Sequence, residues 1–291
     1  MAPQQAVPAV PPCPVCGPAT EGDPSGSLAP APVWRPAPPQ PTLAGDEIHV
    51  WRAGLDVDAY RLRRLTDVLS SEERTRAGRF RLPRDSARYV AGRGLLRELL
   101  GRYLDAAPSR LCFSYGSHGK PALAGQMAEQ GLRFNVSHSH GLALYAFARD
   151  RELGVDVERI RTGLADTPAA ERFLAPEEAT VLRALPPAQR ETAFFTCWCR
   201  KEAYLKAKGL GLALPLDQFV VTVTPGEPAK LLAARWDAHE PPRWRLADLA
   251  PARQYAGAVA VEGYSWQLRC WDWPARAESM PGSRGRPTPS E

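Results

Sequence analysis

Residues 198–211 read W-C-R-K-E-A-Y-L-K-A-K-G-L-G, and this stretch places a carboxylate on the apolar face of a predicted helix. At 3.6 residues per turn, one stripe of the helix carries the side chains of Phe194, Phe195, Trp198 and Leu205. Glu202 falls inside that stripe. A glutamate in such a position must be protonated, paired or bound to a cation, because an isolated buried charge is very costly.

Two further carboxylates come from the upstream stretch G-V-D-V-E at residues 154–158. In a β-strand, Asp156 and Glu158 point to one face of the sheet while the neighbouring valines point to the other. Three inward carboxylates from a strand and a helix suggest a site for a hard cation, with Mg²⁺ holding a phosphorylated substrate. The alternation alone also allows a solvent-facing polar edge of a strand.

The overall composition is that of an ordinary soluble globular protein, with 291 residues that are 44% hydrophobic and 24% charged. We find no run of 18 apolar residues, so we expect no membrane span. The N-terminal residues lack the basic and apolar regions of a secretory signal. We therefore expect a cytoplasmic protein whose six cysteines are reduced.

Positive charge is concentrated in residues 61–102, which contain twelve arginines, no lysine and five acidic residues. The local balance of +7 exceeds the +5 of the whole chain. Arginine binds phosphate and carboxylate groups bidentately, so this segment predicts a polyanionic partner. A solvated basic helix face is the alternative interpretation.

The chain divides into two Pro-rich ends and a patterned centre. Residues 1–45 and 274–291 are expected to be disordered tails. The single C-x-x-C at residues 13–16 has no further ligands nearby, so we predict no zinc site there. Between the tails we expect an α+β fold of two pseudo-symmetric α/β halves, residues 46–150 and 151–273.

The predicted elements follow the hydrophobic periodicity and the turn residues. Strands are expected at 47–52, 111–115, 133–136, 141–148, 152–158, 219–223, 255–262 and 265–271. Helices are expected at 56–69, after Ser70, at 86–103, 176–185 and 187–208. The strands at 141–148 and 152–158 are expected to form a hairpin.

Taken together, the motifs resemble those of the 4′-phosphopantetheinyl transferase superfamily, in its long, single-chain, surfactin-synthetase-activating type. The resemblance covers roughly residues 48–261. Its motifs are G-K-P at 119–121, F-N-V-S-H-S at 134–139, G-V-D-V-E at 154–158, W-x-x-K-E-x-x-x-K at 198–206, G-x-G-L at 209–212 and P-L at 215–216. The family transfers the phosphopantetheine arm of coenzyme A to a serine of a carrier protein and releases adenosine 3′,5′-bisphosphate. The resemblance implies an active site in the cleft between the two halves.

The resemblance also implies roles for individual residues. Asp156, Glu158 and Glu202 match the family's Mg²⁺ ligands, which hold the cation against the pyrophosphate of coenzyme A. Glu202, or a water that it orients, is the candidate catalytic base for the serine hydroxyl. Lys206 matches a catalytic lysine near the transferred phosphate, although an i,i+4 surface pair with Glu202 is the alternative.

Contacts to coenzyme A are implied for a set of basic and polar residues: Arg76, Arg88, Lys120, Ser137, His138, Lys201 and Lys206. On chemistry alone, a single histidine such as His138 is more often a structural hydrogen-bonding group. Lys201 lies about 100° around the helix from Glu202.

Two other functions are compatible with parts of the sequence. A different Mg²⁺-dependent phosphotransferase is disfavoured because the chain has no G-x-x-x-x-G-K-[ST] loop. A nucleic-acid-binding protein using the arginines of residues 61–102 remains the alternative, but inward carboxylates would repel phosphate. We therefore expect as partners coenzyme A and an apo acyl or peptidyl carrier protein of fatty acid, polyketide or nonribosomal peptide synthesis. We expect neither nucleic acid nor membrane as a partner, and a monomer because one chain supplies both halves.

Overall fold

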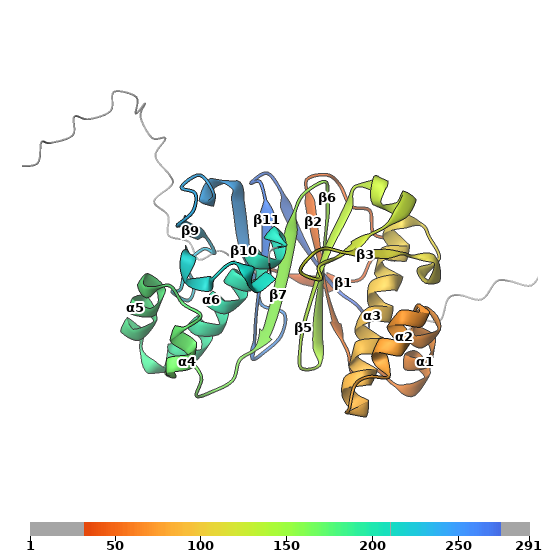
Figure 1. The fold of residues 1–291 in the computed structure, drawn as a ribbon, viewed down its shortest axis with the longest axis horizontal. Helices are drawn as coiled ribbons and strands as arrows, with labels where there is room; N and C mark the ends of the chain where they lie inside the picture. Colours follow the sequence, from red (N-terminus) through yellow and green to blue (C-terminus); the bar gives the residue numbers. More distant parts are fainter. Residues whose placement is uncertain (1–31, 210, 275–291) are drawn as a thin grey trace, which may run out of the picture.

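The computed structural model describes residues 32–209 and 211–274 (Figure 1). Its α-helices are α1 (Ala59–Asp67), α2 (Ser71–Ala77), α3 (Pro83–Leu104), α4 (Pro168–Glu171), α5 (Pro176–Ala184) and α6 (Pro187–Lys208). Its strands are β1 (Trp34–Pro36), β2 (Glu47–Gly54), β3 (Phe113–Tyr115), β4 (Pro121–Leu123), β5 (Leu132–Ser139), β6 (Leu142–Arg149), β7 (Leu153–Arg159), β8 (Phe219–Val221), β9 (Leu231–Ala234), β10 (Trp244–Leu249), β11 (Tyr255–Glu262) and β12 (Gln267–Asp272).

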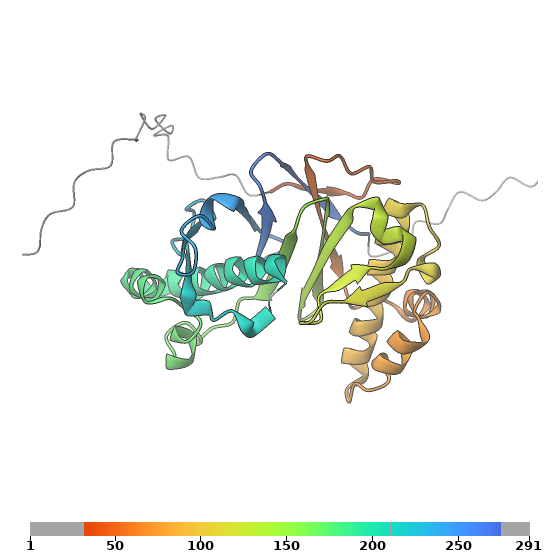
Figure 2. The same ribbon diagram turned by 45° about the horizontal axis from the view of Figure 1, so that its top comes forward.

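Two sheets stand face to face at the centre of the molecule. One has the strand order β1-β12-β2-β6-β5 and the other has the order β10-β11-β7. The 22-residue helix α3 packs on the first sheet and the 22-residue helix α6 packs on the second (Figures 1 and 2). This arrangement of helix, sheet, sheet and helix confirms the predicted α+β class.

Strand β6 shows why the two sheets stay together. Its residues Ala143, Tyr145 and Phe147 belong to the core beneath α3. The alternate residues Leu144, Ala146 and Ala148 belong to a separate core between the sheets, which also contains Val155 and Val157 of β7. Because successive side chains of a strand point to opposite faces, β6 is buried on both sides and its sequence is almost continuously apolar.

Several local predictions are confirmed. The side chain of Ser70 accepts a hydrogen bond from the backbone of Glu73, and the Glu73 side chain accepts one from the backbone of Ser70, so α2 begins with a capping box. Helix α6 begins at Pro187 and ends before Gly209, which adopts a left-handed conformation with φ = 68°.

The predicted hairpin between residues 141–148 and 152–158 is wrong. Strand β6 pairs with β5 and β2, whereas β7 pairs with β11 in the other sheet. The chain therefore crosses between the sheets at residues 150–152, and this connection begins with Asp150, which has a positive φ of 49°. The hairpin forms instead between β5 and β6, through the turn at His140 and Gly141.

Strands near the two ends of the described chain join the first sheet. Strand β12 follows the second half in sequence but pairs in parallel with β2 of the first sheet. Strand β1, which lies inside the predicted 1–45 tail, pairs with β12, and Leu43 is buried. The C-x-x-C of residues 13–16 and the end of the chain from residue 275 lie outside the described residues. Among the described residues, no helix is both long and apolar enough to cross a bilayer.

Gly154 of β7 lies directly against helix α6. A β-carbon built at this position would collide with the backbone of Ala203 and Ala207. Glycine is therefore required here because the backbone of the strand packs directly against the backbone of the helix and leaves no room for a side chain.

We expect Gly154→Ala to lower the free energy of unfolding by about 3 kcal/mol, the upper end of the range for overpacked cores, because the colliding atoms are rigid backbone. Urea denaturation followed by circular dichroism measures the change. Gly45→Ala is the matched control, since a β-carbon at Gly45 meets nothing within 4 Å. Equal stabilities of the two variants would contradict the proposed close contact.

Candidate active site

Four side chains of helix α6 bind three carboxylates of neighbouring elements and hold the helix in one rotational orientation. The donors on α6 and their partners are Arg200 with Asp248 of β10, Lys201 with Glu178 of α5, and Tyr204 and Lys208 with Glu240. These side chains leave the helix on faces other than that of Glu202 and Lys206. The contacts therefore fix the helix so that Glu202 and Lys206 lie toward β7.

Asp156 is the most deeply buried carboxylate of the site, with 3% of its surface exposed. Its Oδ1 accepts a hydrogen bond from Ser137 Oγ at 2.8 Å and one from Lys206 Nζ at 2.6 Å. Its Oδ2 is buried without a hydrogen-bond partner in the part of the chain that the structure describes. An unsatisfied buried carboxylate oxygen is costly, so this atom suggests an absent ligand.

The other two predicted carboxylates are electrostatically coupled to Asp156. Burial raises the pKa of Glu158 and of Glu202, and the negative charge of Asp156 raises both further. Lys206 opposes this effect for both groups. The structure thus brings together the strand and helix carboxylates that the sequence analysis singled out.

The fit of a metal ion can be judged from these donors. In the described residues, no group of three or more histidine, cysteine, aspartate or glutamate side chains is arranged to hold a metal. A closed three-carboxylate cage is therefore not preformed. Mg²⁺, however, usually keeps several waters and binds one or two carboxylates together with substrate phosphates. The free Oδ2 of Asp156 and a neighbouring glutamate fit such an open site.

Ser137 and Lys206 form a network with Asp156. Ser137 is 6% exposed, and its hydroxyl accepts hydrogen bonds from Lys206 Nζ at 2.9 Å and from the Val157 backbone N–H at 3.3 Å. Its bonds are thus made to protein groups, and it positions Asp156 and Lys206. The alternative of a surface pair between Lys206 and Glu202 is wrong, because Lys206 pairs with Asp156.

His138 follows Ser137 on β5 and is exposed. Desolvation by the surrounding groups lowers the pKa of His138, and the positive charge of Lys206 lowers it further. The imidazole therefore lies close enough to sense the charge of the Asp156–Lys206 network, while its surface stays open to a ligand.

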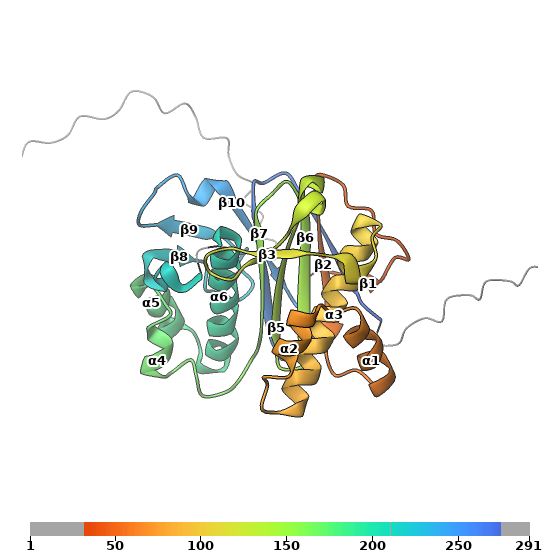
Figure 3. The same cartoon turned by 45° about the vertical axis from the view of Figure 1, so that its right-hand side comes forward.

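Lys120 lies where the β3–β4 hairpin reaches across to α6 (Figure 3). Its Nζ donates to Glu152 at 3.0 Å, to the Leu153 carbonyl at 3.2 Å and to the Ala207 carbonyl at 3.0 Å. All three donors of the ammonium group are engaged, so Lys120 ties the first half of the molecule to the C-terminal end of α6.

The two predicted arginines lie on the helical side of the first half. Arg88 of α3 makes a bidentate ion pair with Asp56, both bonds being 2.7 Å, and it packs beside Gly141 in the β5–β6 turn. Arg76 of α2 is exposed and its guanidinium lies 5.6 Å from the centre of the Tyr89 ring.

The prediction that Lys201 contacts coenzyme A is wrong. Only 1% of Lys201 is exposed, and its Nζ donates to Glu178 and to the Phe219 carbonyl at 2.7 Å. Consecutive residues of a helix point in directions about 100° apart, so Lys201 enters the core while Glu202 faces β7.

Ser139 is a residue whose contact with the site the sequence analysis missed. Its hydroxyl donates to Glu158 Oε2 at 2.7 Å and accepts from the Arg159 backbone N–H at 3.1 Å. Polar side chains at alternate positions of a largely buried strand, here Asn135, Ser137 and Ser139, are the sequence signal that identifies such a face.

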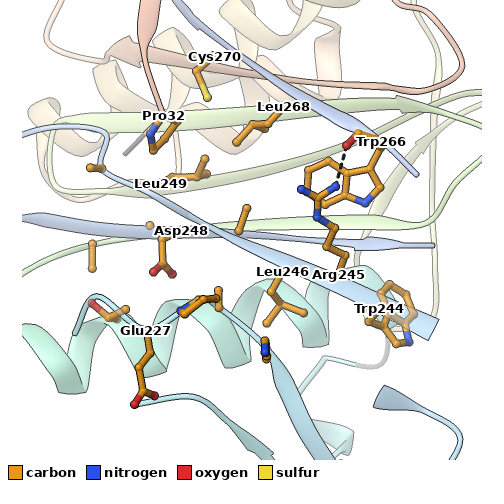
Figure 4. Close-up of a pocket in the computed structure, with 18 of the residues that line it drawn as sticks. Pro32, Glu227, Trp244, Arg245, Leu246, Asp248, Leu249, Trp266, Leu268 and Cys270 are labelled. Atoms are coloured by element: carbon orange, nitrogen blue, oxygen red, sulfur yellow. Dashed lines mark hydrogen bonds between the residues drawn. The ribbon is translucent and has the colours of Figure 1, made fainter. Parts of the chain in front are cut away.

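A cavity of about 1250 Å³ lies elsewhere, beside β10, β11 and β12 (Figure 4). Trp244, Leu246, Leu249, Trp266 and Cys270 are among its lining residues. None of the ten predicted site residues lines this cavity. The chemistry of the side chains, rather than the volume of a cavity, therefore locates the candidate site at the β5–β7 junction.

Comparisons with known proteins find two family models that match this chain. Residues 58–149 match the family described as "4′-phosphopantetheinyl transferase, N-terminal", and residues 152–260 match the "4′-phosphopantetheinyl transferase superfamily". The 4′-phosphopantetheinyl transferase HetI of Nostoc sp. is 44% identical over 240 residues, which cover 82% of this chain and 98% of the relative.

Two Bacillus proteins are also similar. A 4′-phosphopantetheinyl transferase of Bacillus pumilus is 30% identical, with 62% of this chain and 74% of the relative covered. The 4′-phosphopantetheinyl transferase Sfp of Bacillus subtilis is 30% identical, with 54% of this chain and 68% of the relative covered.

The raised pKa of Glu202 gives a pH-dependent prediction in the presence of EDTA. Stability from a carboxyl with a raised folded-state pKa is complete below its ordinary pKa of 4.5 and is lost as the pH rises through the folded-state pKa. We expect Glu202→Gln, which does not titrate, to raise the melting temperature by roughly 2–4 °C at pH 8 and by less at pH 5.

Differential scanning fluorimetry between pH 5 and pH 8 measures this shift. Glu177→Gln is the control, because Glu177 is exposed and its pKa is lowered, first by a backbone hydrogen bond. That variant should gain nothing at high pH. A Glu202→Gln difference that is constant across the range would contradict the electrostatic coupling.

Proposed function

We propose how this site works from the premise that the chain belongs to the 4′-phosphopantetheinyl transferase superfamily and is itself a 4′-phosphopantetheinyl transferase. Such an enzyme moves the phosphopantetheine arm of coenzyme A onto a serine of an apo carrier protein. The serine oxygen bonds to the phosphorus next to pantetheine, the phosphoanhydride bond breaks, and adenosine 3′,5′-bisphosphate leaves. The observation that carries the site assignment is the Ser137–Asp156–Lys206 network with its unpartnered oxygen.

Asp156, Glu158 and Glu202 are the proposed holders of Mg²⁺. The support is the buried Oδ2 of Asp156 together with two carboxyl groups whose pKa values are raised by burial and by Asp156. A bound Mg²⁺ supplies positive charge that neutralises the pyrophosphate as its anhydride bond breaks.

Glu202 is the proposed base for the serine hydroxyl, directly or through a water. The support is the position of Glu202 on the face of α6 that lies toward β7, within electrostatic reach of Asp156 and Lys206. Lys206, held beside Asp156 by Ser137, contributes positive charge toward the transferred phosphate.

Three further residues are proposed contacts for the phosphates of coenzyme A: His138, Arg88 and Arg76. Lys120 is proposed to contact a phosphate by exchanging one of its three present partners. His138 is open at the surface beside Lys206. Arg88 has a bidentate fork that already binds the carboxylate of Asp56, and phosphate has the same preference for such a fork. Arg76 is an exposed positive charge on α2 and would act at longer range.

The reaction is tested by incubating the enzyme with coenzyme A, Mg²⁺ and a panel of apo carrier proteins, followed by intact-mass spectrometry. We expect one phosphopantetheine to be added to at least one carrier. Asp156→Asn and Glu202→Gln should each lower the rate by about 100-fold or more while the circular dichroism spectrum is unchanged. Glu177→Gln, a matched exposed change, should keep full activity; equal activity of all three variants would contradict the assignment.

The nucleic-acid alternative loses support from the structure and finds none in the comparisons. Arg93 and Arg97 of the basic segment pair with the two carboxylate oxygens of the buried Glu73, and Arg61 pairs with Glu98. A substantial part of the positive charge therefore stabilises the packing of α1, α2 and α3. Coenzyme A with Mg²⁺, and not DNA or RNA, should raise the melting temperature.

Part of the remaining charge is proposed to attract the carrier protein. Carrier proteins of this kind are generally acidic around the modified serine, and Arg63 and Arg64 of α1 are exposed. We also propose that the enzyme acts as a monomer, since one chain supplies both halves of the site. We propose in addition that it acts in the cytoplasm.

Charge reversal of Arg63 and Arg64 to glutamate should raise the KM for carrier protein several-fold at low salt and leave the KM for coenzyme A unchanged. The effect should shrink as salt screens exposed charges. Arg88→Ala should show the opposite pattern, raising the KM for coenzyme A. Steady-state kinetics at low and high salt measure both constants. An unaltered carrier KM in the reversed variant would place docking elsewhere.

A further inference from the structure

The two halves of the molecule meet where β5 of the first half lies beside β7 of the second, and side chains of β5 bridge the two strands. Strands β5 and β7 lie side by side but belong to different sheets (Figures 1 and 3). Alternate residues of β5 accept hydrogen bonds from backbone N–H groups of β7: Asn135 Oδ1 from Val155 at 2.9 Å, Ser137 Oγ from Val157 at 3.3 Å and Ser139 Oγ from Arg159 at 3.1 Å. We call Asn135, Ser137 and Ser139 the bridging ladder.

The two serines of the bridging ladder make a second bond that the asparagine does not make. Ser137 Oγ donates to Asp156 at 2.8 Å, and Ser139 Oγ donates to Glu158 Oε2 at 2.7 Å. A serine hydroxyl has one proton to donate and lone pairs with which to accept. In both serines the N–H of β7 occupies an acceptor direction and the hydroxyl donates to the carboxylate. Ser139 Oγ also lies 3.2 Å from Nδ1 of His140, whose role as donor or acceptor depends on its tautomer.

We propose that Ser139 is a positioning residue that sets the orientation of Glu158 for the cation. Ser139 is 7% exposed and belongs to the first half, whereas Glu158 belongs to the second. The direction of the carboxylate therefore depends on how the two halves are joined. This role rests on the proposed function, because it requires Glu158 to act toward a metal ion.

A purely structural role for Ser139 makes a different prediction. If the serine only joined β5 to β7, its loss would resemble the loss of Asn135, which is also buried and also accepts one N–H of β7. Asn135→Ala is therefore a matched control: it removes a bridging bond without removing a donor to a carboxylate. The two variants should lose similar stability but differ in metal binding.

The experiment measures Mn²⁺ binding to the enzyme–coenzyme A complex by electron paramagnetic resonance, with Mn²⁺ as the probe for a hard divalent cation. We expect Ser139→Ala to weaken Mn²⁺ binding about tenfold or more, as is typical when a group that orients a metal ligand is removed. Asn135→Ala should bind Mn²⁺ like the wild type. Excess Mg²⁺ should restore transfer by Ser139→Ala, because its kcat is affected less than its Mg²⁺ requirement.

A second pair of variants separates the hydroxyl from the space that it fills. Ser139→Thr and Ser139→Val have nearly the same shape, but only threonine retains a donor for Glu158. Threonine should keep Mn²⁺ affinity within about threefold of the wild type, and valine should lose it as alanine does. This pair also decides the matter if Ser139→Ala is too unstable to measure.

The outcomes distinguish this role from the reaction itself. Equal Mn²⁺ affinity in Ser139→Thr and Ser139→Val, or an equal loss in Ser139→Ala and Asn135→Ala, would overturn the positioning role while the wild type still transfers phosphopantetheine. A wild-type enzyme that neither transfers phosphopantetheine nor binds Mn²⁺ would overturn the proposed function and the positioning role with it.

Discussion

The absence of a side chain at Gly154 is the constraint on which the site depends. Helix α6 rests directly on β7 at this residue, with the backbone of Ala203 and Ala207 in contact with the strand. A larger residue would push the helix outward and separate its acidic and basic side chains from Asp156, two positions further along β7. The glycine and the carboxylates of one short motif thus act together. The glycine sets the distance between β7 and α6, and that distance places the carboxylates of β7 near the charged side chains of α6.

Holding several carboxylates in a half-buried place has an electrostatic cost, and the fold meets it in two ways. Lys206 places its positive charge beside Asp156, which offsets part of the repulsion among the carboxylates. The buried pair of Lys201 with Glu178 and the pair of the buried Arg200 with the partly exposed Asp248 keep the helix from turning its charged face toward water. Buried ion pairs often contribute little net stability, so their value here is in fixing one helix orientation.

Local signals in the sequence identified most elements, whereas strand pairing was not accessible from them. The capping box at Ser70, the end of α6 at Gly209 and the alternation around Asp156 each depend on neighbouring residues alone. The strands that pair with β6 cannot be predicted from its own residues, because both of its faces are apolar and each face is buried in a different core. Strand β1 has only three residues, which are too few to show the alternation of apolar and polar residues that predicts a strand. For Lys201 the motif match and the helical geometry disagree, and the geometry, which turns its side chain about 100° away from Glu202, agrees with its burial.

The site is composed of parts from both halves, so its geometry depends on how firmly they are joined. Ser137 comes from β5, Asp156 from β7 and Lys206 from α6. The apolar core between the sheets and the bridging ladder both hold β5 against β7. Strand β12 adds a topological restraint, because it leaves the second half and pairs with β2 in the first sheet. The halves cannot separate without breaking that sheet, so a single chain can maintain a site that is divided between two halves.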